Sequence, residues 1–268
     1  MSAKISFIGG GNMAEAMLSA LLKNGISSPN GVCVSDIKPE RRQYMAQKYG
    51  IRAVANNLEA VTDADMVVLA VKPQNIGKVM AELKGNLKPE LLILSIIAGA
   101  GIAKIENGLD HHRIVRVMPN TPAQIGQGMS VWMATASVSA EQKKLAGSVL
   151  KAMGKEIMVS DEDFIDKATA VSGSGPAYLF LFVESLAAAA ENLGFTPEVA
   201  STLVLQTVLG SSRFLAESGR TPAELRKAVT SPGGTTAAAL AVFEQGHFSE
   251  LVKEAVAAAY RRARKLGK

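Results

Sequence analysis

The octapeptide from Val229 to Thr236 places hydroxyl side chains and two glycines directly before an apolar, helix-like stretch. Its sequence is Val-Thr-Ser-Pro-Gly-Gly-Thr-Thr. The glycines allow positive φ and a close approach of the backbone to a ligand. Unpaired N–H groups at the start of the following helix favour an anion. A small carboxylate suits such a cradle, whereas the alternative interpretation is an ordinary helix N-cap after a turn.

A second group of residues, Gly9–Ala14, reads Gly-Gly-Gly-Asn-Met-Ala and matches the glycine-rich loop of dinucleotide-binding proteins. It follows an apolar run, Ile5–Ile8, and opens a helical pattern, which is the context that this motif requires. We expect Gly9 to make the tight turn, Gly11 to let the backbone approach a pyrophosphate, and Ala14 to allow close packing of helix and strand. The loop therefore predicts dinucleotide binding.

Asp36 ends the second strand-like run, where an acidic residue usually accepts the ribose hydroxyls of NAD. Nearby hydroxyl and basic side chains are close enough in sequence to engage the additional phosphate of NADP instead. They are Ser35, Lys38, Arg41 and Arg42. A third interpretation makes Asp36 the N-cap of the next helix. These alternatives stay open.

Two proline-containing loops, Ala70–Pro73 and Met118–Pro122, follow strand-like runs. Open α/β sheets bind ligands at the carboxyl ends of their strands, so two such loops favour a shaped nicotinamide pocket. Prolines there can also be simple stops. A third loop, Ser172–Pro176, opens the most apolar helix, and it can be a plain helix start with proline in the first turn.

The elements that must position these loops follow from the hydrophobic pattern, which is typical of βαβ units in the first half. Buried strands are expected at 5–8, 32–35, 66–71, 91–96 and 114–118, with edge strands at 129–133 and 156–159. Helices are expected at 12–24 and 39–49, and then, after the strand pattern ends, at 163–169, 176–193, 197–217, 222–229, 236–244 and 249–265. The predicted fold class is α/β: a Rossmann-type doubly wound, mostly parallel sheet over 1–160, followed by an all-helical domain over 161–268.

Composition describes a globular protein: 268 residues, 48% apolar and 20% charged. The net charge of +5 comes from the basic residues within 261–268, while the rest of the chain is neutral. A basic end of a last helix is usually solvated, and no basic face is interleaved with aromatic residues, so nucleic acid is not an expected partner.

The single cysteine, Cys33, cannot form an intrachain disulfide and indicates a reducing compartment. The N-terminus lacks the pattern of a signal peptide, and the longest apolar run, Leu91–Ala103, is too short for a bilayer. We therefore expect a cytoplasmic protein without a membrane partner. The three histidines have no metal-ligand spacing with Cys33, and no metal is predicted.

Five blocks of this sequence resemble, in the same order, those of pyrroline-5-carboxylate reductase. They are Phe7–Ala14, Ala70–Pro73, Arg116–Pro122, Ser172–Tyr178 and Thr230–Thr236. The last two are specific to that family, whereas the first is shared by many dehydrogenases. The resemblance implies reduction of 1-pyrroline-5-carboxylate to L-proline by NADPH or NADH, the final step of proline synthesis. It also implies a helical dimerisation domain that interlocks with its twin in a homodimer, often within a larger homo-oligomer.

The resemblance also assigns site residues. The cofactor set is Ile8, Gly9, Gly10, Gly11, Asn12, Met13, Ser35, Asp36, Asn57, Ala70, Val71, Lys72, Pro73 and Ala98. The substrate set is Ser231, Gly234, Thr235 and Thr236. Hydride addition to a cyclic imine needs little beyond positioning, so we assign Thr236 a catalytic role in orienting and polarising the imine. Asp36 departs from members that prefer NADPH, because a carboxylate there would repel a 2′-phosphate.

Two other functions were weighed. A β-hydroxyacid dehydrogenase would carry a catalytic lysine on the first long helix of the second domain, but 176–193 contains no lysine. A dinucleotide-binding regulatory protein without chemistry is distinguished by cofactor binding without turnover. The stretch 178–190 is apolar on nearly every face apart from Glu184, which favours burial against a partner subunit.

Overall fold

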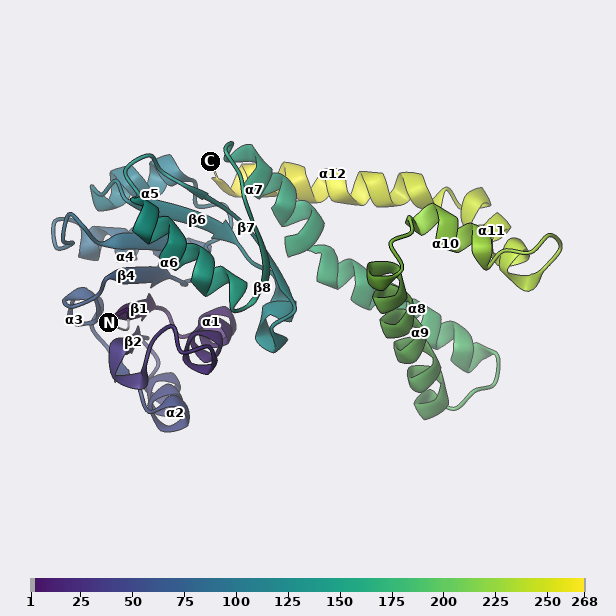
Figure 1. Ribbon diagram of the computed structural model, residues 1–268, viewed down its shortest axis with the longest axis horizontal. Coiled ribbons are helices and arrows are strands. Elements are labelled where there is room, and N and C mark those ends of the chain that lie inside the picture. Colours follow the sequence, from purple (N-terminus) through teal and green to yellow (C-terminus); the bar gives the residue numbers. More distant parts are fainter. Residues whose placement is uncertain (1–2, 268) are drawn as a thin grey trace. The chain divides into compact units, whose positions relative to one another are not determined.

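The computed structural model describes residues 3–267, which form two compact units (Figure 1). Unit 1 runs to Ser174 and resumes at Ala259, so it contains the glycine-rich loop and the end of the last helix. Unit 2 is Gly175–Ala258 and contains the Val229–Thr236 octapeptide.

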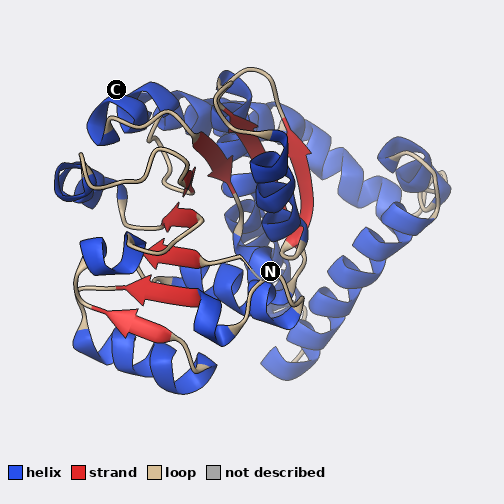
Figure 2. Cartoon of the chain, turned by 60° about the vertical axis from the view of Figure 1, so that its left-hand side comes forward, coloured by secondary structure: helices blue, strands red, loops and turns tan. Residues whose placement is uncertain are grey.

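Unit 1 is built on one sheet of eight strands in the order β3-β2-β1-β4-β5-β6-β7-β8. Figure 2 shows strands of this sheet in red among blue helices. Strands β1 to β6 pair in parallel, β7 is antiparallel to β6, and β8 is again parallel to β7. The bounds are β1 (Ile5–Ile8), β2 (Val32–Ser35), β3 (Arg52–Val54), β4 (Met66–Leu69), β5 (Leu92–Ser95), β6 (Ile114–Met118), β7 (Gly128–Ala134) and β8 (Gly154–Met158). The predicted doubly wound, mostly parallel sheet is confirmed.

Within the described residues, six α-helices connect these strands, and a seventh, α7, follows β8. The bounds are α1 (Asn12–Lys23), α2 (Pro39–Tyr49), α3 (Asn57–Val61), α4 (Ile76–Leu83), α5 (Ile102–Leu109), α6 (Ala140–Lys151) and α7 (Asp163–Ala168). Three 3₁₀ turns are η1 (Pro29–Gly31), η2 (Pro73–Asn75) and η3 (Thr121–Ile125), and a π-helical turn, η4 (Thr169–Gly173), follows α7. Short polar signals set several ends. Gly50 ends α2 in a left-handed conformation, Asn56 caps α3, and Ser139 with Gln142 forms a capping box on α6.

The core of unit 1 has two layers, one on each face of the sheet. Alternate residues of the strands point to opposite faces, so Phe7 and Val34 pack in one layer while Ile8 and Cys33 pack in the other. Helices α1, α2 and α6 cover the first face, and α3, α4 and α5 cover the second. Strands β1, β2, β4 and β5 are buried along their whole length, which explains their continuous apolar sequences.

Unit 2 contains α8 (Gly175–Asn192), α9 (Pro197–Glu217), α10 (Pro222–Ala228), α11 (Thr235–Gln245) and the first part of α12 (Phe248–Gly267). Thr196 caps α9, and Thr221 with Glu224 forms a capping box on α10. The last part of α12 belongs to unit 1, where the Tyr260 hydroxyl donates to Asp163 on α7 at 2.6 Å.

Large apolar side chains of unit 2 are exposed in the single chain. Phe180 and Leu181 on α8 are 63% and 64% exposed, and Leu209 and Phe214 on α9 are 57% and 58% exposed. Within the described residues, α9 is the one helix long and apolar enough to cross a membrane, by length and composition only. A soluble helix whose apolar surface is covered by other protein passes the same test.

Most predicted elements are present, including all eight predicted helices, with ends that differ by no more than a few residues. Strand β3 and the helices α3, α4, α5 and α6 were not predicted from the sequence. The predicted domain boundary at residue 160 stays a prediction. Strands end with β8 at Met158, whereas α7 and η4 belong to the same compact unit as the sheet.

Candidate functional site

The glycine-rich loop joins β1 to α1 at the carboxyl edge of the sheet. Gly9 has φ +100°, and its amide donates to the Ser35 carbonyl at 2.8 Å. A β-carbon on Gly9 would lie 2.9 Å from the carbonyl oxygen of Ala70, so the two strand ends approach as only glycine permits. Gly11 precedes α1 with φ −66°, and a β-carbon there would meet nothing within 4 Å.

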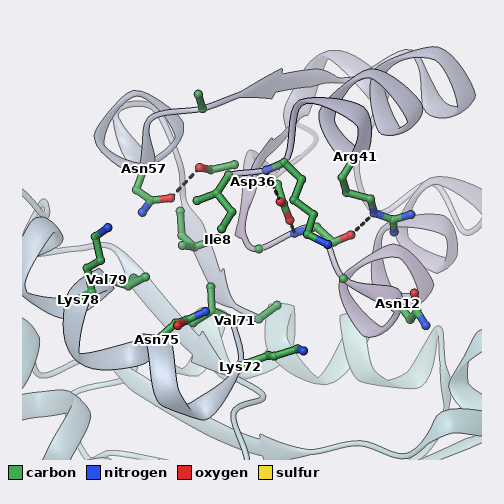
Figure 3. Close-up of a pocket in the computed structure, with 18 of the residues that line it drawn as sticks. Ile8, Asn12, Asp36, Arg41, Asn57, Val71, Lys72, Asn75, Lys78 and Val79 are labelled. Atoms are coloured by element: carbon green, nitrogen blue, oxygen red, sulfur yellow. Dashed lines mark hydrogen bonds between the residues drawn. The ribbon is translucent and has the colours of Figure 1, made fainter.

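A cleft of about 830 Å³ opens over this loop (Figure 3). Its wall comes from the glycine-rich loop, the ends of β2 and β4, and one side each of α2 and α4. The lining residues are Ile8, Gly9, Gly10, Gly11, Asn12, Ser35, Asp36, Ile37, Lys38, Glu40, Arg41, Tyr44, Ala55, Asn57, Ala70, Val71, Lys72, Asn75, Lys78, Val79 and Glu82.

These residues fit a dinucleotide. A β-carbon on Gly11 would meet nothing within 4 Å, so the space beside this residue is open. The first N–H groups of α1 have no carbonyl partner inside the helix and can bind an anion there. Ala14 is 1% exposed and lets α1 pack closely on the sheet. The cleft therefore has the small loop residues and the helix N-terminus that a pyrophosphate needs.

Asp36 stands beside the loop, held by two backbone amides. Its Oδ2 accepts from Gly10 N–H at 2.8 Å, and its Oδ1 accepts from Lys38 N–H at 2.9 Å (Figure 3). The N-cap position of α2 is Lys38, so the interpretation of Asp36 as that N-cap is wrong. The carboxylate is tied to the glycine-rich loop instead.

Ser35 and Asn57 form a short polar chain at the same end of the cleft. The Ser35 hydroxyl donates to Asn57 Oδ1 at 2.6 Å (Figure 3), and Asn57 Nδ2 donates to Glu82 Oε2 at 2.9 Å. Ser35 is buried, and its hydroxyl is occupied by this contact. The chain fixes the amide of Asn57 against the cleft wall.

The side chain of Arg41 turns away from the middle of the cleft toward α1. Its Nε donates to the Gly10 carbonyl, and its Nη2 donates to Glu15 Oε2 at 2.5 Å. Glu15 Oε1 also accepts from the side chains of Tyr44, Lys48 and Tyr49 at 2.8–2.9 Å. Burial raises the pKa of Glu15, but the donors Lys48, Arg41, Tyr49 and Tyr44 outweigh it and lower the pKa to about 2.

A smaller cavity of about 270 Å³ shares Ala70 and Val71 with the cleft. It lies where β4, β5 and β6 end. Its lining residues are Met13, Ala70, Val71, Pro73, Ile96, Ile97, Ala98, Met118, Pro119, Asn120, Thr121 and Gly173. The apolar wall and the position at the carboxyl edge suit a nicotinamide ring, as the two proline loops predict.

Arg116 fixes α7, the helix that leads into Gly173. The Arg116 guanidinium is almost fully buried; Nη1 donates to Glu162 Oε1 at 2.7 Å and Nη2 to Asp166 Oδ1 at 2.5 Å. Glu162 Oε1 also accepts from the amide of Ile102, the first residue of α5. One buried cation thus joins β6, α5 and α7 beneath the smaller cavity.

The predicted substrate residues lie together in unit 2 at the start of α11. Gly233 has φ +72°, Gly234 is the N-cap residue, and the Gly234 amide donates to the Ser231 carbonyl at 3.1 Å. The octapeptide thus forms a turn and the N-cap of α11, as the alternative interpretation predicts, although the N-cap residue is Gly234 and no side chain caps the helix. Thr236 is half-buried, whereas Ser231 and Thr235 are exposed.

All fourteen predicted cofactor residues line the cleft or the smaller cavity. Several residues that line the same walls were not predicted from the sequence: Ile37, Glu40, Tyr44, Ala55, Asn75, Lys78, Val79, Glu82, Ile96 and Ile97. Four of these residues, Asn75, Lys78, Val79 and Glu82, lie on η2 and α4 at the spacing of one helical face. This spacing identifies them only if α4 is first predicted as a helix. Within residues 3–267, no group of three or more His, Cys, Asp and Glu side chains could hold a metal ion.

Comparison with known proteins agrees with the geometry. Residues 162–266 match the family model of pyrroline-5-carboxylate reductase dimerisation, and residues 4–99 match that of NADP oxidoreductase, coenzyme F420-dependent. A pyrroline-5-carboxylate reductase of Pseudomonas aeruginosa is 46% identical over 98% of this chain and 96% of its own length. One from Synechocystis is 41% identical over the full length of both chains.

Solved structures give the same result. A pyrroline-5-carboxylate reductase from Coxiella burnetii is 43% identical with a TM-score of 0.91, covering all of both chains. A pyrroline carboxylate reductase from Plasmodium falciparum, with NADP bound, is 31% identical with a TM-score of 0.90 over 99% of this chain and 98% of its own. Together with the site geometry, these similarities show that the chain belongs to the pyrroline-5-carboxylate reductase family of NAD(P)H-dependent oxidoreductases.

Proposed function

We propose that this chain reduces 1-pyrroline-5-carboxylate to L-proline with NADPH or NADH as the hydride donor. The observation that carries the proposal is the continuous wall of Ala70 and Val71 between the dinucleotide cleft and the smaller cavity. A ligand that follows this wall from the glycine-rich loop has its far end in the apolar cavity. Family membership supplies the substrate class.

The residues of unit 1 bind and orient the cofactor. The glycine-rich loop and the first N–H groups of α1 receive the pyrophosphate, and Asp36 and Asn57 lie at the adenosine end. Ala98, Met118 and Asn120 surround the smaller cavity, which would hold the reactive ring away from water. When bound there, the reduced nicotinamide would supply a hydride to the carbon of the protonated C=N bond, whose π electrons become the lone pair of the ring nitrogen.

The start of α11 holds the substrate in this proposal. Helix geometry leaves the N–H groups of Thr235, Thr236 and Ala237 without carbonyl partners inside α11, so they can receive the substrate carboxylate. The half-buried Thr236 hydroxyl can donate or accept a hydrogen bond and orients the ring nitrogen. Thr236 therefore positions and polarises the imine and is not a strong acid.

The oligomeric state extends this proposal. The exposed apolar faces of α8 and α9 and the match to a dimerisation model support a homodimer that assembles into a larger homo-oligomer. A boundary near residue 160 between a dinucleotide domain and a dimerisation domain agrees with the residues matched by that model. We further propose that the enzyme acts in the cytoplasm without membrane or nucleic-acid partners.

The test is a steady-state assay of wild type and Thr236→Ala with 1-pyrroline-5-carboxylate, using NADPH and NADH separately. We expect wild-type oxidation of the cofactor that depends on the imine and yields L-proline. Thr236→Ala should lower both turnover and substrate affinity while cofactor affinity and the melting temperature persist. Cofactor binding without turnover of the imine would support the regulatory alternative, and unchanged kinetics in Thr236→Ala would refute its role.

A further inference from the structure

The adenosine end of the cleft contains both carboxylates and cations, which have opposite preferences for the two cofactors. The charged residues that line the cleft are the carboxylates Asp36, Glu40 and Glu82 and the cations Lys38, Arg41, Lys72 and Lys78. In this fold the residue that ends the second strand lies beside the adenosine ribose. NADH presents a 2′-hydroxyl there, whereas NADPH presents a 2′-phosphate with a charge near −2.

The carboxylate of Asp36 is held in place at this position as a hydrogen-bond acceptor. The amides of Gly10 and Lys38 hold one carboxylate oxygen each, at 2.8 and 2.9 Å, so the group cannot swing away from an incoming phosphate without losing two hydrogen bonds. An ionised carboxylate has about four lone-pair sites. Two remain for the vicinal hydroxyls of a ribose.

Arg41, a cation that could neutralise a 2′-phosphate, already has partners. Its guanidinium donates to Glu15 and to the Gly10 carbonyl. Glu15 is held in turn by Tyr44, Lys48 and Tyr49, and its low pKa keeps it ionised. Arg42 is also occupied, because its Nη1 donates to the Asp36 carbonyl at 2.8 Å.

The hydroxyl of Ser35, which could also bind a 2′-phosphate, already has a hydrogen-bond partner. Ser35 donates to Asn57 at 2.6 Å, and Asn57 donates onward to Glu82. Lys38 lies exposed at the rim and lines the cleft. A 2′-phosphate would thus stand beside a fixed carboxylate, with the exposed ammonium of Lys38 rather than a guanidinium to offset its charge.

We propose that this chain selects NADH over NADPH at the adenosine ribose, with Asp36 as the acceptor of the 2′-hydroxyl and Glu15 as a positioning residue that withholds Arg41 from a 2′-phosphate. The proposal rests on the dinucleotide cleft of the proposed function and does not depend on the imine chemistry. Juxtaposed like charges in a binding site predict roughly 10- to 100-fold tighter binding of NADH.

The experiment measures dissociation constants with the full-length protein by titrating NADH and NADPH and following nicotinamide fluorescence, without substrate. AMP and adenosine 2′,5′-bisphosphate, which differ only in the 2′-phosphate, serve as a second pair of probes by calorimetry. Wild type should bind NADH and AMP more tightly than their 2′-phosphorylated counterparts. Equal or tighter binding of NADPH would overturn the proposal, as would binding of neither cofactor.

Three variants test the assigned roles. Asp36→Ser should remove most of the preference, and Asp36→Asn, which keeps an acceptor for the Gly10 amide, should do the same without disturbing the loop. Glu15→Gln should raise NADPH affinity several-fold with little change for NADH, since it weakens the hold on Arg41. The matched control is Glu40→Gln, which neutralises an exposed carboxylate of the same cleft. An equal shift in Glu40→Gln would show a diffuse charge effect and overturn the assignment to Asp36.

The same titrations separate this proposal from the proposed function. Preferential NADH binding by a protein that does not reduce the imine would support the cofactor selection and contradict the reductase activity. Imine reduction with a preference for NADPH would support the reductase activity and contradict the cofactor selection.

Discussion

A hydrogen bond from Asn120 to Ser172 joins the loop after β6 to the turn η4, and both segments line the smaller cavity. Asn120 Nδ2 donates to the carbonyl of Ser172 at 3.1 Å, and Asn120 Oδ1 accepts from the amide of Met129 at 2.8 Å. Ser172 belongs to the π-helical turn η4, a type of turn that is often found at functional sites. One side chain thus fixes the loop after β6 against the turn that supplies Gly173 to the cavity wall.

Replacement of Asn120 by Ala should impair positioning in the cavity more than cofactor affinity. Misplacement of a reacting ring by about 1 Å costs up to about 100-fold in rate, so we expect turnover to fall about 10- to 100-fold. The adenosine and pyrophosphate contacts lie elsewhere in the cleft, and the NADH dissociation constant should change less than about threefold. Steady-state kinetics and cofactor titration check this together. A loss of affinity as large as the loss of turnover would contradict the positioning role.

Gly9 and Gly11 should respond differently to alanine. Gly9→Ala forces a side chain into φ +100° and against the Ala70 backbone, so it should lower the free energy of unfolding by roughly 1–3 kcal/mol. Gly11→Ala should leave the free energy of unfolding nearly unchanged, because its β-carbon meets no protein atom. We expect this β-carbon to occupy space that the pyrophosphate needs.

Urea unfolding and cofactor titration of both variants, at one fixed protein concentration, separate the two effects. The expected pattern is a destabilised Gly9→Ala and a stable Gly11→Ala with cofactor affinity reduced at least about tenfold. Normal cofactor binding by Gly11→Ala would place the pyrophosphate elsewhere.

Arg116→Met should be among the most destabilising substitutions in unit 1. It removes the buried partner of two carboxylates, and breaking a buried ion pair costs roughly 3–5 kcal/mol. The control is Lys151→Ala, which removes an exposed lysine from a long ion pair with Glu156 at 3.7 Å and should cost no more than about 1 kcal/mol. Similar unfolding midpoints for the two variants would show that Arg116 does not hold α7.

The ionised carboxylate of Glu15 should stabilise the folded protein at neutral pH, and this stabilisation should be lost in acid. The folded pKa of about 2 lies below the ordinary value of 4.5, so the stabilisation is complete above pH 4.5 and is lost as the pH falls toward 2. The free energy of unfolding of wild type should therefore exceed that of Glu15→Gln by roughly 1–3 kcal/mol at neutral pH. This difference should shrink below pH 4.5. Urea unfolding at several pH values measures it. A difference that grows on acidification has the wrong sign for this carboxylate.

The sequence predicts the fold well where local and tertiary signals agree. Mostly apolar runs without strict alternation identify β1, β2, β4, β5 and β6, because strands buried on both faces need no alternation. Strand β3 has three residues, of which Arg52 is exposed, and so lacks such a run. Helices α3, α4 and α5 are eight residues or fewer, and short helices derive their stability mainly from packing on the sheet.

The same distinction holds for the site. Glycine spacing identifies the pyrophosphate loop, since the motif and its context are local. The engagement of Arg41 by Glu15 joins residues 26 positions apart on α1 and α2, and Asn120 meets Ser172 across 52 positions. Such contacts depend on tertiary packing and have no local signature. The role of Asp36 also needed the structure, because the sequence cannot distinguish an N-cap from a carboxylate held by Gly10.

The most direct test of the reductase activity follows the hydride itself. Full-length enzyme is incubated with 1-pyrroline-5-carboxylate and nicotinamide cofactor deuterated at the reactive ring carbon, using each face-labelled form in turn, and the proline is analysed by mass spectrometry. We expect L-proline to carry deuterium at the former imine carbon with one of the two labelled forms of the cofactor. Formation of proline without label from either form, or no formation of proline, would contradict it.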